Sequence, residues 1–98
     1  MAQISSCEEL AREMEALPLC WRIMVFFLNR QDTLETLEGI ADWWLQEDRR
    51  STKDALDRLT ALGLVVRRTR GGRELFSYTS DSSLRAIAEG LYIRPKAA

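Results

Sequence analysis

Apolar side chains recur at helical spacing through the first part of the chain. Ser6 followed by Glu9 predicts a capped helix that runs to about Leu17. Its apolar stripe is Cys7, Leu10, Met14 and Leu17. Pro18 breaks this pattern and fits the first turn of a second helix. That helix has a broad apolar face suited to a core, made of Leu19, Cys20, Ile23, Met24, Phe27 and Leu28.

Two further helices are predicted between residues 32 and 63. Asp32 and Glu35 form a possible capping box for the third helix. Its expected inward residues are Leu34, Leu37, Ile40, Ala41, Trp44 and Leu45, and the neighbouring Trp43 is expected at a helix margin or in a partner contact. After a polar connection, Ser51 or Thr52 is expected to cap the fourth helix, which ends at Gly63. Its inward residues are Ala55, Leu56, Leu59 and Leu62.

The hydrophobic period changes after the fourth helix. Two β-prone runs, 64–69 and 74–79, flank the turn Arg70–Arg73 and predict a β-hairpin. Asp81 is expected to cap a last helix with an apolar face, and Pro95 to end it. That face is Leu84, Ile87, Ala88 and Leu91. The expected fold is mainly α with a small β-hairpin wing: one winged helix-turn-helix domain over 1–98, with an N-terminal helix (1–17), a core (18–79) and a C-terminal helix (82–93).

Composition narrows the class of protein. The chain has 98 residues, of which 46% are hydrophobic and 30% charged, as in an ordinary globular domain. No apolar run approaches the roughly 18 residues of a membrane span, and no secretory signal is visible, so we expect a cytoplasmic protein without membrane contact. The absence of histidine excludes His-based acid–base catalysis, and two cysteines are too few for a usual zinc site. We therefore expect no enzyme, no metal and no cofactor.

The net charge of −1 hides a segregation of charge along the chain. Residues 1–48 hold three Arg against ten Asp and Glu, a net charge of −7. Residues 49–98 hold eleven Lys and Arg against five Asp and Glu, a net charge of +6. Such asymmetry indicates a surface that faces a polyanion.

The basic residues gather on the fourth helix and the hairpin. The third and fourth helices would form a helix-turn-helix, with the fourth as recognition helix. Lys53 and Arg58 would reach the major groove, and Ser51 and Thr52 would hydrogen-bond to the DNA backbone. The hairpin arginines would contact the backbone or the minor groove, although a charged edge that only prevents aggregation is the alternative. The candidate DNA-binding residues are Arg50, Ser51, Thr52, Lys53, Arg58, Arg67, Arg68, Arg70 and Arg73.

Two stretches carry a resemblance to a known group of proteins. Leu37–Leu45 and Arg50–Val65 resemble bacterial winged-helix regulators of the MarR and ArsR types, most closely at 57–59 and 63–65. By element order the resemblance covers roughly residues 18–91. It implies DNA binding, usually as a homodimer, and transcriptional repression rather than activation. Metal sensing as in ArsR-type proteins does not carry over, because residues 50–62 contain no cysteine.

Other features keep a second function open. Asp54 and Asp57 face outward on the proposed recognition helix, where carboxylates oppose phosphate. A winged-helix module that binds another protein instead of DNA is therefore the alternative. The apolar stripes of the two terminal helices can pack on their own domain or form a homodimer. Cys20 is expected in the core, and Cys7 is expected to pack rather than to sense peroxide.

Overall fold

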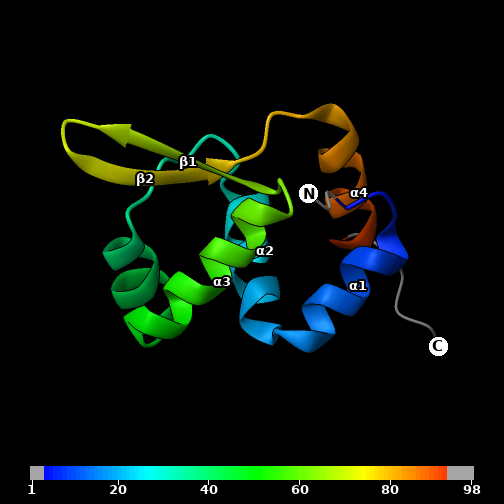
Figure 1. Ribbon diagram of the computed structural model, residues 1–98, viewed down its shortest axis with the longest axis horizontal. Helices are drawn as coiled ribbons and strands as arrows, with labels where there is room; N and C mark the ends of the chain where they lie inside the picture. The colour runs from blue at the N-terminus through cyan, green and yellow to red at the C-terminus, as the bar shows by residue number, and fades with distance from the viewer. Residues whose placement is uncertain (1–3, 93–98) are drawn as a thin grey trace.

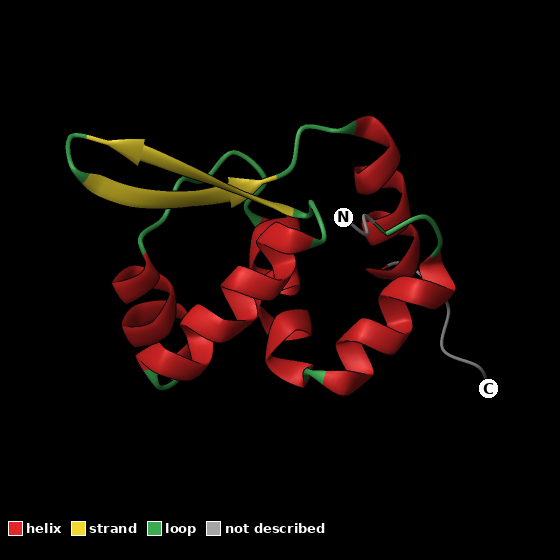
Figure 2. Cartoon of the chain, viewed as in Figure 1, coloured by secondary structure: helices red, strands yellow, loops and turns green. Residues whose placement is uncertain are grey.

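Between residues 4 and 92 the chain folds as five helices and one antiparallel hairpin, in the order predicted from the sequence (Figure 1, Figure 2). The structure is a computed structural model that describes residues 4–92. The elements are α1 (Cys7–Ala16), α2 (Pro18–Asn29), η1 (Gly39–Leu45), α3 (Arg49–Ala61), β1 (Val65–Arg70), β2 (Arg73–Tyr78) and α4 (Ser82–Tyr92).

The starts of α1, α2 and α4 agree with the prediction, and side chains cap α1 and α4. Ser6 Oγ accepts a hydrogen bond from the Glu9 amide at 3.2 Å, Pro18 is the first residue of α2, and Asp81 Oδ1 accepts from the first turn of α4. The cap predicted for α3 is wrong. Asp48, rather than Ser51 or Thr52, is the N-cap, and its carboxylate accepts the Ser51 amide at 2.8 Å. An aspartate three residues earlier caps as well as a serine, so the helix gains Arg49 and Arg50.

The core lies between α2 and α3. The apolar face predicted for α2 is buried, apart from the half-buried Leu19, and Phe26 joins it. From α3, the four predicted inward residues are buried as expected: Ala55, Leu56, Leu59 and Leu62. The strand residues Val65, Phe76 and Tyr78 close the core from the hairpin side. Burial of these faces fixes which side of α3 is left to solvent.

The third helix differs from its prediction. Thr36, not Asp32, plays the capping role, since Thr36 Oγ1 accepts from the Gly39 amide at 3.0 Å. The segment Gly39–Leu45 is a π-helix, whose wider turn places residues five apart on one face. Ile40 is therefore buried and Leu45 half-buried, while Trp44 turns outward and is 44% exposed. The prediction that Trp44 and Leu34 point inward is wrong.

The hairpin has the predicted turn. Gly71 and Gly72 have φ values of 58° and 78°, the left-handed region that a tight two-residue hairpin turn requires. Glu35 ties the hairpin to the helices through a single bridge to Phe76: the Phe76 amide donates to the Glu35 carbonyl at 2.7 Å and the Glu35 amide to the Phe76 carbonyl at 3.0 Å. The hairpin projects from one end of the molecule, and α1 and α4 lie at the other (Figure 1).

The terminal helices bury part of their apolar stripes within the chain. α1 packs against both α2 and α4, and Leu10, Met14, Leu84 and Ala88 are buried. A homodimer through these helices stays a prediction, and it would have to use side chains that remain exposed, such as Leu17 and Tyr92. The predicted end at Pro95 lies outside the described residues. Between residues 4 and 92, no helix has the length and apolar character needed to cross a bilayer.

Candidate nucleic-acid interface

The outward face of α3 is the one predicted from the sequence. Arg50, Lys53, Asp54 and Arg58 are exposed, and Asp57 is partly exposed. Thr52 does not belong to this face. Its side chain is fully buried and Oγ1 donates to the Asp48 carbonyl at 2.9 Å, so the prediction that Thr52 contacts DNA is wrong. The reason is the earlier start of α3, which places residue 52 on the inner side of the first turn.

Ser51 is exposed but already engaged. Its hydroxyl donates to Asp48 Oδ2 at 2.7 Å, in addition to the amide contact of the cap. The two bonds hold the pKa of the Asp48 carboxyl below its usual value. The amide and the hydroxyl of Ser51 therefore both serve the Asp48 cap of α3, and the hydroxyl hydrogen is already used in that contact.

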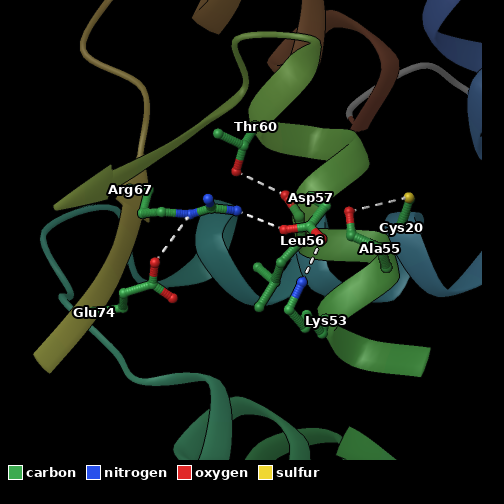
Figure 3. Close-up of polar contacts among 8 residues, drawn as sticks. All are labelled: Cys20, Lys53, Ala55, Leu56, Asp57, Thr60, Arg67 and Glu74. Carbon is green, nitrogen blue, oxygen red and sulfur yellow. Dashed lines mark hydrogen bonds and ion pairs between the residues drawn. The ribbon is translucent and has the colours of Figure 1, made fainter. Parts of the chain in front are cut away.

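Asp57 is the centre of an ion-pair network that joins α3 to the hairpin (Figure 3). Lys53 Nζ lies 2.8 Å from Asp57 Oδ2, Arg67 contacts Asp57 Oδ1, and Arg67 Nε lies 3.7 Å from Glu74. The Lys53 hydrogen bond, followed by the charges of Lys53 and Arg67, lowers the pKa of the Asp57 carboxyl. The network orients Arg67 along α3, with its guanidinium 5.6 Å from the centre of the Phe76 ring.

Arg58 is paired with a residue from the other end of the chain. Its guanidinium donates to both carboxylate oxygens of Glu13 on α1, at 2.8 and 2.6 Å. This fork-to-fork contact lowers the pKa of Glu13. Two of the predicted groove-contacting cations, Lys53 and Arg58, therefore already have a carboxylate partner.

The strand register sorts the hairpin arginines onto two faces. Residues directly opposite one another project to the same side of a hairpin, and successive residues alternate. Arg67 pairs with Phe76 and lies on the face that closes the core. Arg68 pairs with Leu75, and Arg70 pairs with Arg73, so these arginines share the outer face. We call Arg68, Arg70 and Arg73 the outer arginines.

The outer arginines are exposed, and none of them forms an ion pair with any residue between 4 and 92. Arg70 and Arg73 oppose each other across the turn, an arrangement of like charges that destabilises a hairpin. Arg73 also borders a hollow of about 260 Å³ shared with Thr36, Leu37, Glu38 and Glu74. Together with Arg50 on α3, the outer arginines are thus the cations of the predicted site that form no ion pair within the described chain.

Comparison with known proteins gives a fold and no function. No known family matches this sequence, and no curated protein is similar to it. The crystal structure of the ST1889 protein from the thermoacidophilic archaeon Sulfolobus tokodaii has a similar fold, with a TM-score of 0.54. The similarity covers 87% of this chain and 96% of that chain at 19% sequence identity. At this identity it shows the fold alone, and the name of that protein states no activity.

Sequence reasoning missed two features near this surface. Glu13 was not expected at α3, because nothing in a local pattern indicates a contact between residues 45 positions apart. Trp43 and Trp44 form an exposed aromatic surface beside Glu35, and Trp43 is 83% exposed. The exposure of Trp43 agrees with its predicted position at a helix margin or in a partner contact, because two adjacent tryptophans cannot both point into one core, whereas the exposure of Trp44 was missed. Cys20 is buried as predicted, and burial raises the pKa of its thiol to about 11.

Proposed function

We propose that this chain is a winged helix-turn-helix protein that binds double-stranded DNA with sequence specificity and regulates transcription. The element order supports the fold assignment: α2, a one-residue bridge at Glu35, η1, α3 and then the hairpin. In this assignment α3 is the recognition helix and the hairpin is the wing. Arg50, Lys53 and Arg58 on α3 would face the major groove.

The outer arginines carry the proposal. The hairpin carries three cations on one face, and two of them, Arg70 and Arg73, lie directly opposite each other. Repulsion between these like charges destabilises the hairpin, and a bound polyanion would relieve it. A wing of this kind can follow the phosphates or enter the minor groove. Arg67 would act differently, since its contact with Asp57 fixes the angle between hairpin and α3.

The internal ion pairs do not oppose this reading. Lys53, Arg58 and Arg67 are all partly exposed in their pairs, and exposed pairs of this kind contribute little to stability. Phosphate can therefore replace a carboxylate partner at low cost. The same pairs favour the second candidate, a winged-helix module for a protein partner, because Asp57 and Glu13 reduce the positive potential of α3.

Fluorescence anisotropy with a mixed-sequence duplex across a salt series tests the proposal. Each phosphate contact steepens the dependence of log K on log salt by about 0.9, so Arg68→Ala with Arg70→Ala should flatten the slope by roughly 1 to 2. Arg12→Ala, which removes an exposed arginine of α1, is the control and should leave the slope unchanged. No binding at low salt would refute the proposal and favour the protein-interaction module.

A further inference from the structure

A surface hollow beside η1 belongs to none of the predicted DNA-contacting residues. It has a volume of about 260 Å³ and is lined by Glu35, Gly39, Trp43 and Trp44. We call it the tryptophan hollow. Exposed indole rings are rare on a surface that has no partner, because each carries a large apolar area.

The carboxylate of Glu35 is held in the wall of the hollow by neutral donors. Trp44 Nε1 donates to Glu35 Oε2 at 3.1 Å, and the Thr36 amide donates to Glu35 Oε1 at 3.2 Å. No Lys or Arg among residues 4–92 forms an ion pair with Glu35. A Cβ at residue 39 would overlap Glu35 Oε1, so the carboxylate reaches this position only because residue 39 is glycine.

The chain itself shows that this aromatic surface accepts a cation. The Arg30 guanidinium lies 4.0 Å from the centre of the Trp44 ring and 5.6 Å from that of Phe26. Phe26 also packs on Trp44, with ring centres 5.2 Å apart, and neither Arg30 nor Phe26 lines the tryptophan hollow, which therefore uses only the part of Trp44 that these two residues leave exposed. Trp43 has no such partner between residues 4 and 92.

The surrounding charge selects the sign of a ligand. Residues 31–48 contain six acidic residues and neither Lys nor Arg. Two of these acids are compensated, Asp42 by Arg49 and Glu47 by Arg22. Glu35 and Glu38 form no ion pair with any residue that the structure describes, and the acidic residues of this segment outnumber the neighbouring Arg30 and Arg49, so the local potential favours a cation over an anion.

We propose that the tryptophan hollow binds a small organic cation with an alkylammonium head group. The head group lies against the indole faces of Trp43 and Trp44, which are the best cation–π partners among side chains, and its charge is balanced by Glu35. A volume of about 260 Å³ accommodates one small molecule rather than a peptide segment. This proposal does not rest on the proposed DNA binding.

Titration by NMR of the three indole N–H resonances tests this proposal. Choline is the probe, and the neutral isostere 3,3-dimethyl-1-butanol is the control at equal ionic strength. We expect choline to shift the Trp43 and Trp44 resonances with a Kd of about 1 mM, and to leave that of Trp21, which packs on Tyr92 with ring centres 6.2 Å apart, unchanged. Equal shifts with the alcohol, equal shifts at Trp21, or no saturable shift would each overturn the proposal.

Variants separate the parts of the site. Trp43→Ala should abolish binding, and since Trp43 is almost fully exposed the fold does not depend on it. Glu35→Gln keeps an acceptor for Trp44 and should weaken binding about tenfold, the loss expected for one charge-assisted contact. Trp21→Phe is the matched control and should bind as the unmodified chain does. Retention of affinity in both site variants would refute the assignment.

A second arm distinguishes a free cation from a cationic side chain on a protein. A short neutral peptide with one trimethyllysine presents the same head group. An affinity equal to or below that of choline supports a small-molecule site. Binding of the peptide more than about tenfold tighter than choline would overturn that assignment in favour of a protein ligand.

Discussion

Asp57 offers a sharp test of how α3 and the hairpin share their charges. Asp57→Asn keeps the size of the side chain and removes the charge that compensates Lys53 and Arg67. Under the DNA proposal, two cations then become available to phosphate. Each neutralised phosphate contributes about 0.9 to the slope of log K against log salt, so two additional contacts should steepen this slope by up to about 1.8. Between 50 and 200 mM salt, this amounts to an additional loss of affinity of about twelvefold.

Asp54→Asn is the matched control, because Asp54 lies on the same exposed face and forms no ion pair with any residue in 4–92. It removes the same charge from α3 without releasing a cation. We expect it to raise affinity for any duplex while leaving the slope unchanged. The assay is fluorescence anisotropy with one mixed-sequence duplex. Equal slopes for Asp57→Asn, Asp54→Asn and the unmodified protein would show that removing the Asp57 charge adds no phosphate contact by Lys53 or Arg67.

The pH dependence of stability checks the same network without DNA. The folded-state pKa of Asp57 is lowered, first by the Lys53 hydrogen bond and then by the Lys53 and Arg67 charges. Its contribution to stability is therefore fully present above the unfolded-state pKa, about 3.9, and is lost as pH falls through the lower folded-state pKa. The difference in Tm between Asp57→Asn and the unmodified protein should vanish in this acidic range. A difference that persists there would contradict the assigned cause.

Three further predictions concern the fold around the site. Leu59→Ala, at a fully buried position of α3, should lower the free energy of unfolding by about 2–5 kcal/mol in urea denaturation, and a loss below about 1 kcal/mol would contradict that burial. Gly72→Val, at φ +78°, should cost at least about 1–2 kcal/mol by the same measurement, whereas Gly72→Asn should cost less. Because burial raises the pKa of Cys20 to about 11, iodoacetamide should leave Cys20 unlabelled at pH 8 in the folded protein, as mass spectrometry can show.

Local rules in the sequence were sufficient for most of the fold. Gly71 and Gly72 specify a two-residue turn, and the change of hydrophobic period after Gly63 marks the end of the helices, so the hairpin and its register follow from residues close in sequence. The apolar face of α3 follows in the same way from a spacing of three and four. The outward position of Lys53 and Arg58 is the direct consequence of that face.

The wrong predictions concern features that the 3.6-residue period of an α-helix does not indicate. Trp44 was placed inward because a spacing of 3.6 residues was assumed, and the π-helix at η1 rotates it out. Thr52 was placed at the interface because Asp48 was not recognised as the cap, which shifted the expected start of α3. The partners of Arg58 and Arg67 lie in other elements, and only the tertiary structure brings Glu13 to α3.

The charge segregation of the sequence takes a different meaning in three dimensions. Two ion pairs join the acidic half of the sequence to the basic half: Glu13–Arg58 and Asp42–Arg49. A third, Arg22–Glu47, lies within the acidic half. These pairs use acidic residues that would otherwise face α3 and η1 unpaired. The outer arginines and, with opposite sign, Glu35 and Glu38 are among the charged residues of 4–92 that form no ion pair.

These two sites are linked through one contact. The backbone of Glu35 makes both hydrogen bonds of the bridge to Phe76, and its side chain forms the wall of the tryptophan hollow. Phe76 lies on β2, opposite Arg67 and next to Leu75, which pairs with Arg68. A cation bound at the Glu35 side chain would thus contact a residue whose backbone is hydrogen-bonded to β2, and β2 pairs with the strand that carries Arg68 and Arg70. Coupling between the two proposed ligands is reciprocal by thermodynamic necessity, so choline should change affinity for duplex DNA by the same factor as DNA changes affinity for choline.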